Sequence, residues 1–182
     1  MNWYKEAASY LAYHGTTQDF EEFSYEYMGS TGTAEGFGFY FTSDENVAKM
    51  FADGEQGVLK KAMLEINKPL NFAGRSITED ELAHFIRALD PTGDDYLSNW
   101  GEVGYEGYDN VLRTAVEGEM SGSTNDVDLI SGIIQALGKN AEFVYGVLKQ
   151  SLGYDGIIVD NPNWGGDQVV YVVFDNSQIR YV

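Results

Sequence analysis

Three short segments, widely separated along the 182-residue chain, contain residues whose types could build one binding site. They are residues 13–17 (Tyr-His-Gly-Thr-Thr), 36–42 (Gly-Phe-Gly-Phe-Tyr-Phe-Thr) and 170–179 (Val-Tyr-Val-Val-Phe-Asp-Asn-Ser-Gln-Ile). The imidazole of His14 can donate a hydrogen bond to a hydroxyl group or accept one from it, and Gly15 lets a ligand approach the main chain closely. A lone His-Gly-Thr also fits a surface turn, so the combination of the three segments carries the prediction.

Strands are the elements expected to position these segments. The pattern predicts them over Tyr10–Tyr13, Gly38–Thr42, Val58–Ile66, Gly156–Val159 and Val169–Phe174. Ser43-Asp44-Glu45 has the composition of a helix N-cap followed by first-turn acids, and predicts a helix through Phe51. Residues 2–10 are compatible with a short helix, and residues 16–36 with a loop containing one helical turn.

The middle of the chain changes to helical periodicity. Thr78-Glu79-Asp80-Glu81 resembles a capping box and predicts a helix through Leu89. Further helices are expected over about 108–120, 126–137 and 141–152. The sequence therefore predicts one α+β domain over residues 1–182, with a helical insertion of about 78–152 that could form a subdomain.

The composition excludes several kinds of site. The chain has no Cys, which excludes thiol nucleophiles, disulfides and thiolate zinc sites. The only histidines are His14 and His84, so we expect no metal site and place His84 on a helix face. A formal charge of −18, from 29 acidic and 11 basic residues, opposes binding to phosphate backbones and anionic membranes. It fits a very soluble protein or one that docks a basic partner; no stretch approaches a membrane span, and we expect a cytoplasmic protein.

Taken in order, the three segments resemble the NAD-binding core of the His-Tyr-Glu ADP-ribosyltransferases, the group of diphtheria toxin and the poly(ADP-ribose) polymerases. The end of the chain is most similar to bacterial and phage members, including those in polyvalent proteins, whose strand usually reads Glu-Tyr-Val-Val-Phe-Asp. The resemblance covers about residues 10–66 and 153–182. It implies two small abutting β-sheets with flanking helices, and NAD as substrate without a metal.

The resemblance also implies roles for individual residues. His14 would bind the adenosine ribose, Gly15 would pair through its backbone with the nicotinamide amide, and the neighbouring Thr16 would help to hold NAD. Tyr40 would stack on the nicotinamide, and Phe51, eleven positions later, would form the opposite wall. Offset aromatic stacking contributes roughly 0.5–1.5 kcal/mol beyond burial of area, although Phe51 also fits a packing residue of an amphipathic helix.

Two positions depart from the family pattern. Ala48 stands where the family often has a Ser that binds the carboxamide oxygen, and Val170 stands where it has the Glu. That Glu binds a ribose hydroxyl and stabilises the oxocarbenium-like charge that develops when the nicotinamide–ribose bond breaks, a role that Val lacks. Loss of one such group typically costs about 3–4 kcal/mol of barrier, which weakens the site and leaves open whether activity survives.

Several substitutes for the missing carboxylate stay open. Strand alternation places Gln168 on the face of Val170 and Asp167 on the other face, so Gln168 is the nearest polar group to the reacting ribose. A carboxylate from the loop after His14, from Glu26 or Glu35, is another candidate. Some polymerase relatives have an aliphatic residue at the Glu position and act as mono-ADP-ribosyltransferases, plausibly with the help of an acidic substrate side chain.

The resemblance therefore implies a mono-ADP-ribosyltransferase with catalytic residues His14, Tyr40 and Gln168. Its acceptor would be macromolecular, and the acidic surface favours a protein over a nucleic acid. Bacterial and phage relatives imply a toxin or effector role. The alternative is a catalytically silent relative that binds NAD or a protein partner. A tRNA 2′-phosphotransferase fits poorly because no basic cluster is present to hold RNA.

Overall fold

The computed structural model describes residues 8–27, 35–53, 57–160, 162 and 167–182. The chain divides into two compact units, Met1–Pro69 with Asp155–Val182, and Leu70–Tyr154. Residues 2–7 of the helix-compatible N-terminus lie outside the described residues. From Ser9 onward that prediction is wrong, because the chain is already a strand. The number of domains stays a prediction.

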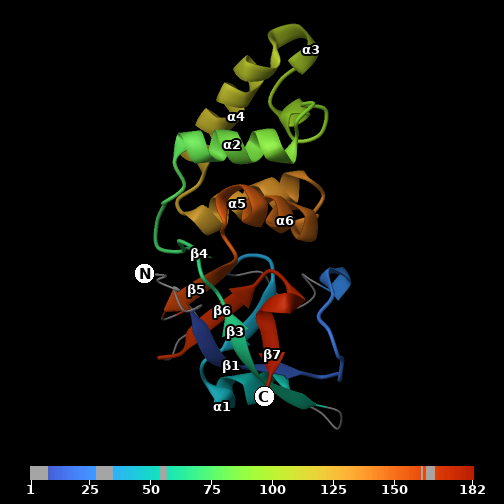
Figure 1. The fold of residues 1–182 in the computed structure, drawn as a ribbon, viewed down its shortest axis with the longest axis vertical. Helices are drawn as coiled ribbons and strands as arrows, with labels where there is room; N and C mark the ends of the chain where they lie inside the picture. Colours follow the sequence, from blue (N-terminus) through green and yellow to red (C-terminus); the bar gives the residue numbers. More distant parts are fainter. Residues whose placement is uncertain (1–7, 28–34, 54–56, 161, 163–166) are drawn as a thin grey trace, which may run out of the picture. The chain divides into compact units, whose positions relative to one another are not determined.

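The first unit is built on a β-sheet (Figure 1). The strand order is β4-β5-β6-β2-β1-β3-β7. The strands are β1 (Ser9–Thr16), β2 (Phe39–Thr42), β3 (Val58–Glu65), β4 (Pro69–Leu70), β5 (Gly156–Asp160), β6 (Val169–Val173) and β7 (Ile179–Tyr181). All the expected strands are present, and β1 extends to Thr16, so that His14, Gly15 and Thr16 belong to the strand itself.

The two sheets expected from the resemblance are joined into one. β1 pairs with β3 along its whole length and β2 pairs with β6 along all four residues. Between β1 and β2, however, the register contains one residue pair, Tyr13 opposite Thr42. We call this short contact the seam. Because the seam is hydrogen-bonded, the strands form one sheet, and the expectation of two sheets is wrong. The α+β class is confirmed.

The aromatic face of the sheet carries the core of the unit. Its buried members are Ala12, Phe39, Phe41, Ala62, Leu64, Ile66, Tyr171 and Val173. Phe23 and Tyr25 pack on this face from the loop after β1, which includes the single helical turn η1 (Tyr25–Tyr27). Side chains alternate between the faces of a strand, so Tyr13, Tyr40, Thr42 and Val170 belong to the opposite face.

Helix α1 (Glu45–Phe51) packs against β1 and β2 on that opposite face. Its N-cap is Asp44, whose carboxylate accepts hydrogen bonds from the N–H groups of Asn46 and Val47. Ser43 has a different role, because its hydroxyl accepts from the N–H of Val169 at 2.9 Å. A Cβ atom on Gly15 would lie 1.7 Å from the carbonyl oxygen of Ala48. The strand and the helix can therefore touch only through a glycine.

The C-terminal segment closes the unit with side-chain hydrogen bonds. In the turn η3 (Asn176–Gln178), the Gln178 carboxamide accepts from the N–H of Phe174 and donates to the carbonyls of Glu65 and Asp155. Asn176 accepts from the N–H of Phe23 at 2.9 Å and donates to its carbonyl at 2.8 Å. Gln178 and Asn176 of this turn thus connect β3, β5 and the loop after β1.

The second unit is helical. It contains α2 (Glu79–Leu89), η2 (Leu97–Asn99), α3 (Val103–Glu106), α4 (Tyr108–Gly122), α5 (Asp126–Ala136) and α6 (Ala141–Leu152). The capping box at Thr78 and Glu81 is confirmed. Asp126, fully buried, accepts from the N–H groups of Asn71, Ser76 and Ile77. It thereby ties the segment before α2 to the start of α5.

The Gly15–Ala48 contact predicts a large effect of one methyl group. We expect Gly15→Ala to lower the free energy of unfolding by about 1–3 kcal/mol, because overpacking of this size displaces backbone. Gly146→Ala is the matched control: Gly146 is exposed inside α6 with nothing within 4 Å of its Cβ position, and should gain about 0.5–1 kcal/mol. Urea denaturation followed by circular dichroism measures both. Equal stability of Gly15→Ala and the wild type would contradict the contact.

Candidate active site

His14 bridges the two strands beside the seam. Its Nδ1 lies 2.7 Å from the carbonyl oxygen of Tyr40. A carbonyl only accepts, so Nδ1 carries the hydrogen and donates it. In the neutral ring, Nε2 is then the nitrogen with a lone pair, which can accept a hydrogen bond from a ligand hydroxyl. One side chain thus joins β1 to β2 and holds an acceptor in a defined tautomer.

Aromatic rings surround the His14 imidazole. Its centroid lies 4.8 Å from that of Phe23, 5.6 Å from Phe41 and 5.9 Å from Phe20. Burial lowers the pKa of His14; the bond to the Tyr40 carbonyl opposes this shift, and the positive charge of Lys60 adds to it. The ring is therefore neutral at physiological pH, as the acceptor role of Nε2 requires.

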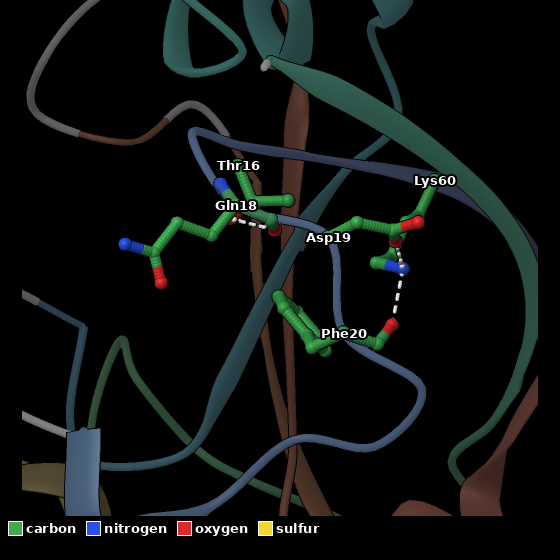
Figure 2. A network of polar contacts seen from close by, with 5 residues as sticks. All are labelled: Thr16, Gln18, Asp19, Phe20 and Lys60. Carbon is green, nitrogen blue, oxygen red and sulfur yellow. Dashed lines mark hydrogen bonds and ion pairs between the residues drawn. The ribbon is translucent and has the colours of Figure 1, made fainter.

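The turn after β1 is held in place by Lys60 of β3, as Figure 2 shows. The Lys60 ammonium donates to the Asp19 carboxylate at 2.8 Å and to the carbonyl of Phe20, and it lies 4.5 Å from the centroid of the Phe20 ring. The Thr16 hydroxyl donates to the Gln18 carbonyl at 3.0 Å and accepts from its N–H. The predicted NAD-binding residue Thr16 thus shapes the turn that places Phe20 against His14.

Tyr40 lies on the face of the sheet that α1 covers. Its hydroxyl donates to the carbonyl of Gly36 and accepts from the N–H of Glu35 at 3.3 Å. Glu35 is 4% exposed. Burial raises the pKa of the Tyr40 hydroxyl well above its usual range, and the negative charge of Glu35 raises it further. The hydroxyl stays protonated, beside the backbone of the buried residue Glu35.

Gly15 and Phe51 are both associated with α1. The fold itself requires a glycine at position 15, whether or not a ligand binds, because the Ala48 carbonyl occupies the space that a side chain would fill. Phe51 is the last residue of α1 and is 57% exposed, which leaves part of its ring accessible to a ligand. Ala48 is buried at 1% exposure. Gly15 and Phe51 therefore share the α1 side of the sheet with Tyr40.

Val170 lies in a row that crosses the sheet through the seam. The register places Tyr13 opposite Thr42, Thr42 opposite Val170, and Val170 opposite Val159. Val170 is 1% exposed. The position of the usual Glu is thus on the same face as Tyr40 and diagonal to it, filled by a buried aliphatic side chain.

Gln168 lines an open depression beside this row. Its lining residues are Tyr13, Ser43, Asp44, Glu45, Asn46, Asp167 and Gln168, around a volume of about 540 Å³. Asp167 and Gln168 both line it, although strand alternation alone would place them on opposite faces. The reason is that β6 begins at Val169, so strand alternation does not govern the two preceding residues. Gln168 is 5% exposed and Asp167 is exposed.

The predicted site residues thus fall into three groups near the seam. A hydrogen bond links His14 to the backbone carbonyl of Tyr40. Gly15 contacts α1, and Phe51 is the last residue of that helix. Gln168 lines the depression together with Tyr13. Sequence analysis missed Tyr13 and Ser43, although both adjoin predicted positions. It named Glu35 without a reason to prefer it; the signal was its distance of five residues from Tyr40.

No group of three or more His, Cys, Asp or Glu side chains among the described residues could hold a metal ion. No helix in the described part of the chain is long and apolar enough to cross a membrane.

A family model of the ADP-ribosyltransferase domains of polyvalent proteins matches residues 7–182. The chain belongs to this family. No curated protein and no solved structure matches it. The family match runs through the helical unit, which the resemblance of the three segments left unexplained. The ADP-ribosyltransferase thus includes α2 to α6 as part of the matched sequence.

The neutral His14 makes the stability of this ADP-ribosyltransferase depend on pH. Because the pKa of His14 is lower in the folded state than its ordinary value of about 6.5, the unfolded chain binds more protons in the window below 6.5. The stabilisation is present above pH 6.5 and is lost as pH falls through the folded pKa. Compared with His14→Asn, the wild type should lose up to about 1.4 kcal/mol more per pH unit there.

Urea denaturation of both proteins between pH 8 and 5 tests this expectation. The Asn amide nitrogen is as many bonds from Cα as Nδ1, so the variant can keep the bond to the Tyr40 carbonyl without titrating. Parallel pH curves for the two proteins would contradict a buried neutral His14.

Proposed function

We propose that this protein is an NAD-dependent mono-ADP-ribosyltransferase. It breaks the bond between nicotinamide and ribose in NAD and transfers ADP-ribose to a macromolecular acceptor. The observation that carries the proposal is the 2.7 Å bond from His14 Nδ1 to the Tyr40 carbonyl. It couples two of the expected NAD-binding residues and leaves Nε2 as an acceptor for a ribose hydroxyl.

NAD would lie across the diverging ends of β1 and β2. His14 is on the aromatic face of the sheet, whereas Tyr40 is on the α1 face, so a dinucleotide can contact both only beside the seam. There His14 Nε2 would accept from the adenosine ribose, and Gly15 and Thr16 would border the ligand. Tyr40 and Phe51 would hold the nicotinamide between them, and Gln168 would approach the nicotinamide ribose.

The acceptor in this proposal is a protein with a basic surface. The chain's charge of −18 attracts such a partner and repels a phosphate backbone. Single transfer fits Val170, because the absent Glu is the residue that helps chain elongation in the polymerases. A toxin or effector role in bacterial or phage conflict, inside the cytoplasm of a cell, is consistent with the family and is part of the proposal.

One observation favours a second candidate, a silent ADP-ribosyltransferase-fold protein that binds NAD or a partner. Val170 is 1% exposed and packs within the sheet, so its own position supplies no charge to the reacting ribose. Binding of NAD without release of nicotinamide would select this alternative.

The test is incubation of the pure protein with labelled NAD and a bacterial lysate. Free nicotinamide and label on macromolecules are measured together. We expect Tyr40→Ala to lower transfer at least tenfold, because it removes one wall of the nicotinamide site. We expect His14→Asn to raise the KM for NAD about tenfold, because it lacks Nε2 while retaining a donor to the Tyr40 carbonyl.

The control is His84→Asn in the helical unit, an identical substitution in α2 that should leave transfer unchanged. Transfer that survives in both Tyr40→Ala and His14→Asn would place the chemistry elsewhere. Bound NAD with neither nicotinamide nor transfer in the wild type would support the silent alternative.

A further inference from the structure

The reaction of the proposed function calls for a carboxylate, and position 170, which the family fills with Glu, has a Val instead. Breaking the nicotinamide–ribose bond builds positive charge on the ribose, which a nearby carboxylate stabilises. Val170 is aliphatic and lies diagonal to Tyr40 on the same face, since Tyr40 is opposite Val172 and Thr42 is opposite Val170. Diagonal neighbours on one face of a sheet are about 7–8 Å apart, so Tyr40 and Val170 are close neighbours on this face.

Glu35 is beside Tyr40. Its N–H donates to the Tyr40 hydroxyl at 3.3 Å, and that hydroxyl donates in turn to the carbonyl of Gly36. These two bonds fix the 35–36 turn to the tip of the Tyr40 side chain. The Glu35 residue is 4% exposed, and its negative charge adds to the burial that raises the pKa of the Tyr40 hydroxyl.

We propose that Glu35 supplies the carboxylate that stabilises the reacting ribose in place of the residue at position 170. This inference rests on the proposed function. The other candidates are weaker on physical grounds. Gln168 carries no charge, and the exposed Glu26 and Asp167 act through water, which weakens their field. A buried, fixed carboxylate requires no reorganisation when the charge develops.

The step is balanced without another reactant. The C1′–N bond breaks with its electron pair leaving on nicotinamide, which departs as a neutral molecule from a pyridinium. The positive charge moves to the ribose C1′ and ring oxygen, where the Glu35 side chain offsets it. The acceptor's oxygen or nitrogen then forms the new bond to C1′, and the acceptor's proton is released to water.

The test measures nicotinamide release and NAD affinity in Glu35→Gln. The substitution keeps the side chain's shape and removes its charge. We expect kcat to fall about 10²–10³-fold, with NAD affinity and melting temperature close to those of the wild type. Glu21→Gln, an exposed glutamate in the loop after β1, is the matched control and should retain wild-type kcat.

Two more variants separate chemistry from folding. Glu35→Asp withdraws the carboxylate by one methylene group, so a folded protein with intermediate kcat is expected, and full activity would count against the proposal. The double variant Glu35→Gln/Val170→Glu restores a carboxylate at the family's position. We expect it to regain at least tenfold over Glu35→Gln, a recovery that a purely structural role of Glu35 would not produce.

The outcomes distinguish this inference from the function on which it rests. An active wild type together with a fully active Glu35→Gln overturns the role of Glu35 and leaves the transferase standing. A fall in NAD affinity that matches the fall in kcat indicates a structural residue and also overturns it. A wild type that releases no nicotinamide overturns both proposals.

Discussion

The seam between β1 and β2 is the constraint on which the rest of the first unit depends. One backbone pair, Tyr13 with Thr42, joins strands that are otherwise held by long ladders to β3 and β6. A contact this short needs support, and the His14 imidazole provides it by donating to the Tyr40 carbonyl. The candidate site therefore lies where the sheet is least continuous.

Each side of the seam is stiffened by a different device. On the α1 face, Gly15 lets the helix backbone touch the strand, so α1 and β1 cannot shift independently. On the aromatic face, Lys60 and Asn176 anchor the loop that carries Phe20 and Phe23 against His14. A buried hydrogen bond to a backbone carbonyl contributes about 0.5–1.5 kcal/mol net. Burial among these anchored rings keeps His14 neutral, and the bond to the Tyr40 carbonyl fixes its tautomer.

Sequence reasoning succeeded where local signals decide the structure. The capping box at Thr78 and Glu81 and the apolar periodicity of α6 predicted helices close to their observed bounds. It failed where long-range contacts decide. No local pattern shows that Gly15 faces the Ala48 carbonyl or that β1 and β2 share a pair. The sequence showed which residue types could form the candidate site. The face of the sheet on which each residue lies became known only from the strand register.

The aliphatic residue at position 170 has a physical rationale in the seam. Val170 belongs to the row Tyr13, Thr42, Val170 and Val159, and burying a Val side chain contributes about 1.5–3 kcal/mol. A carboxylate at the same point would lose that burial and would itself require a partner, since an unpaired buried charge is expensive. A negative charge on the 35–36 turn, as proposed for Glu35, leaves this row of the sheet apolar, because the turn lies outside the ladder and its position is set by the Tyr40 hydroxyl. In the proposed role of Glu35, the stability of the sheet at the seam and the charge for the reaction are supplied by different residues.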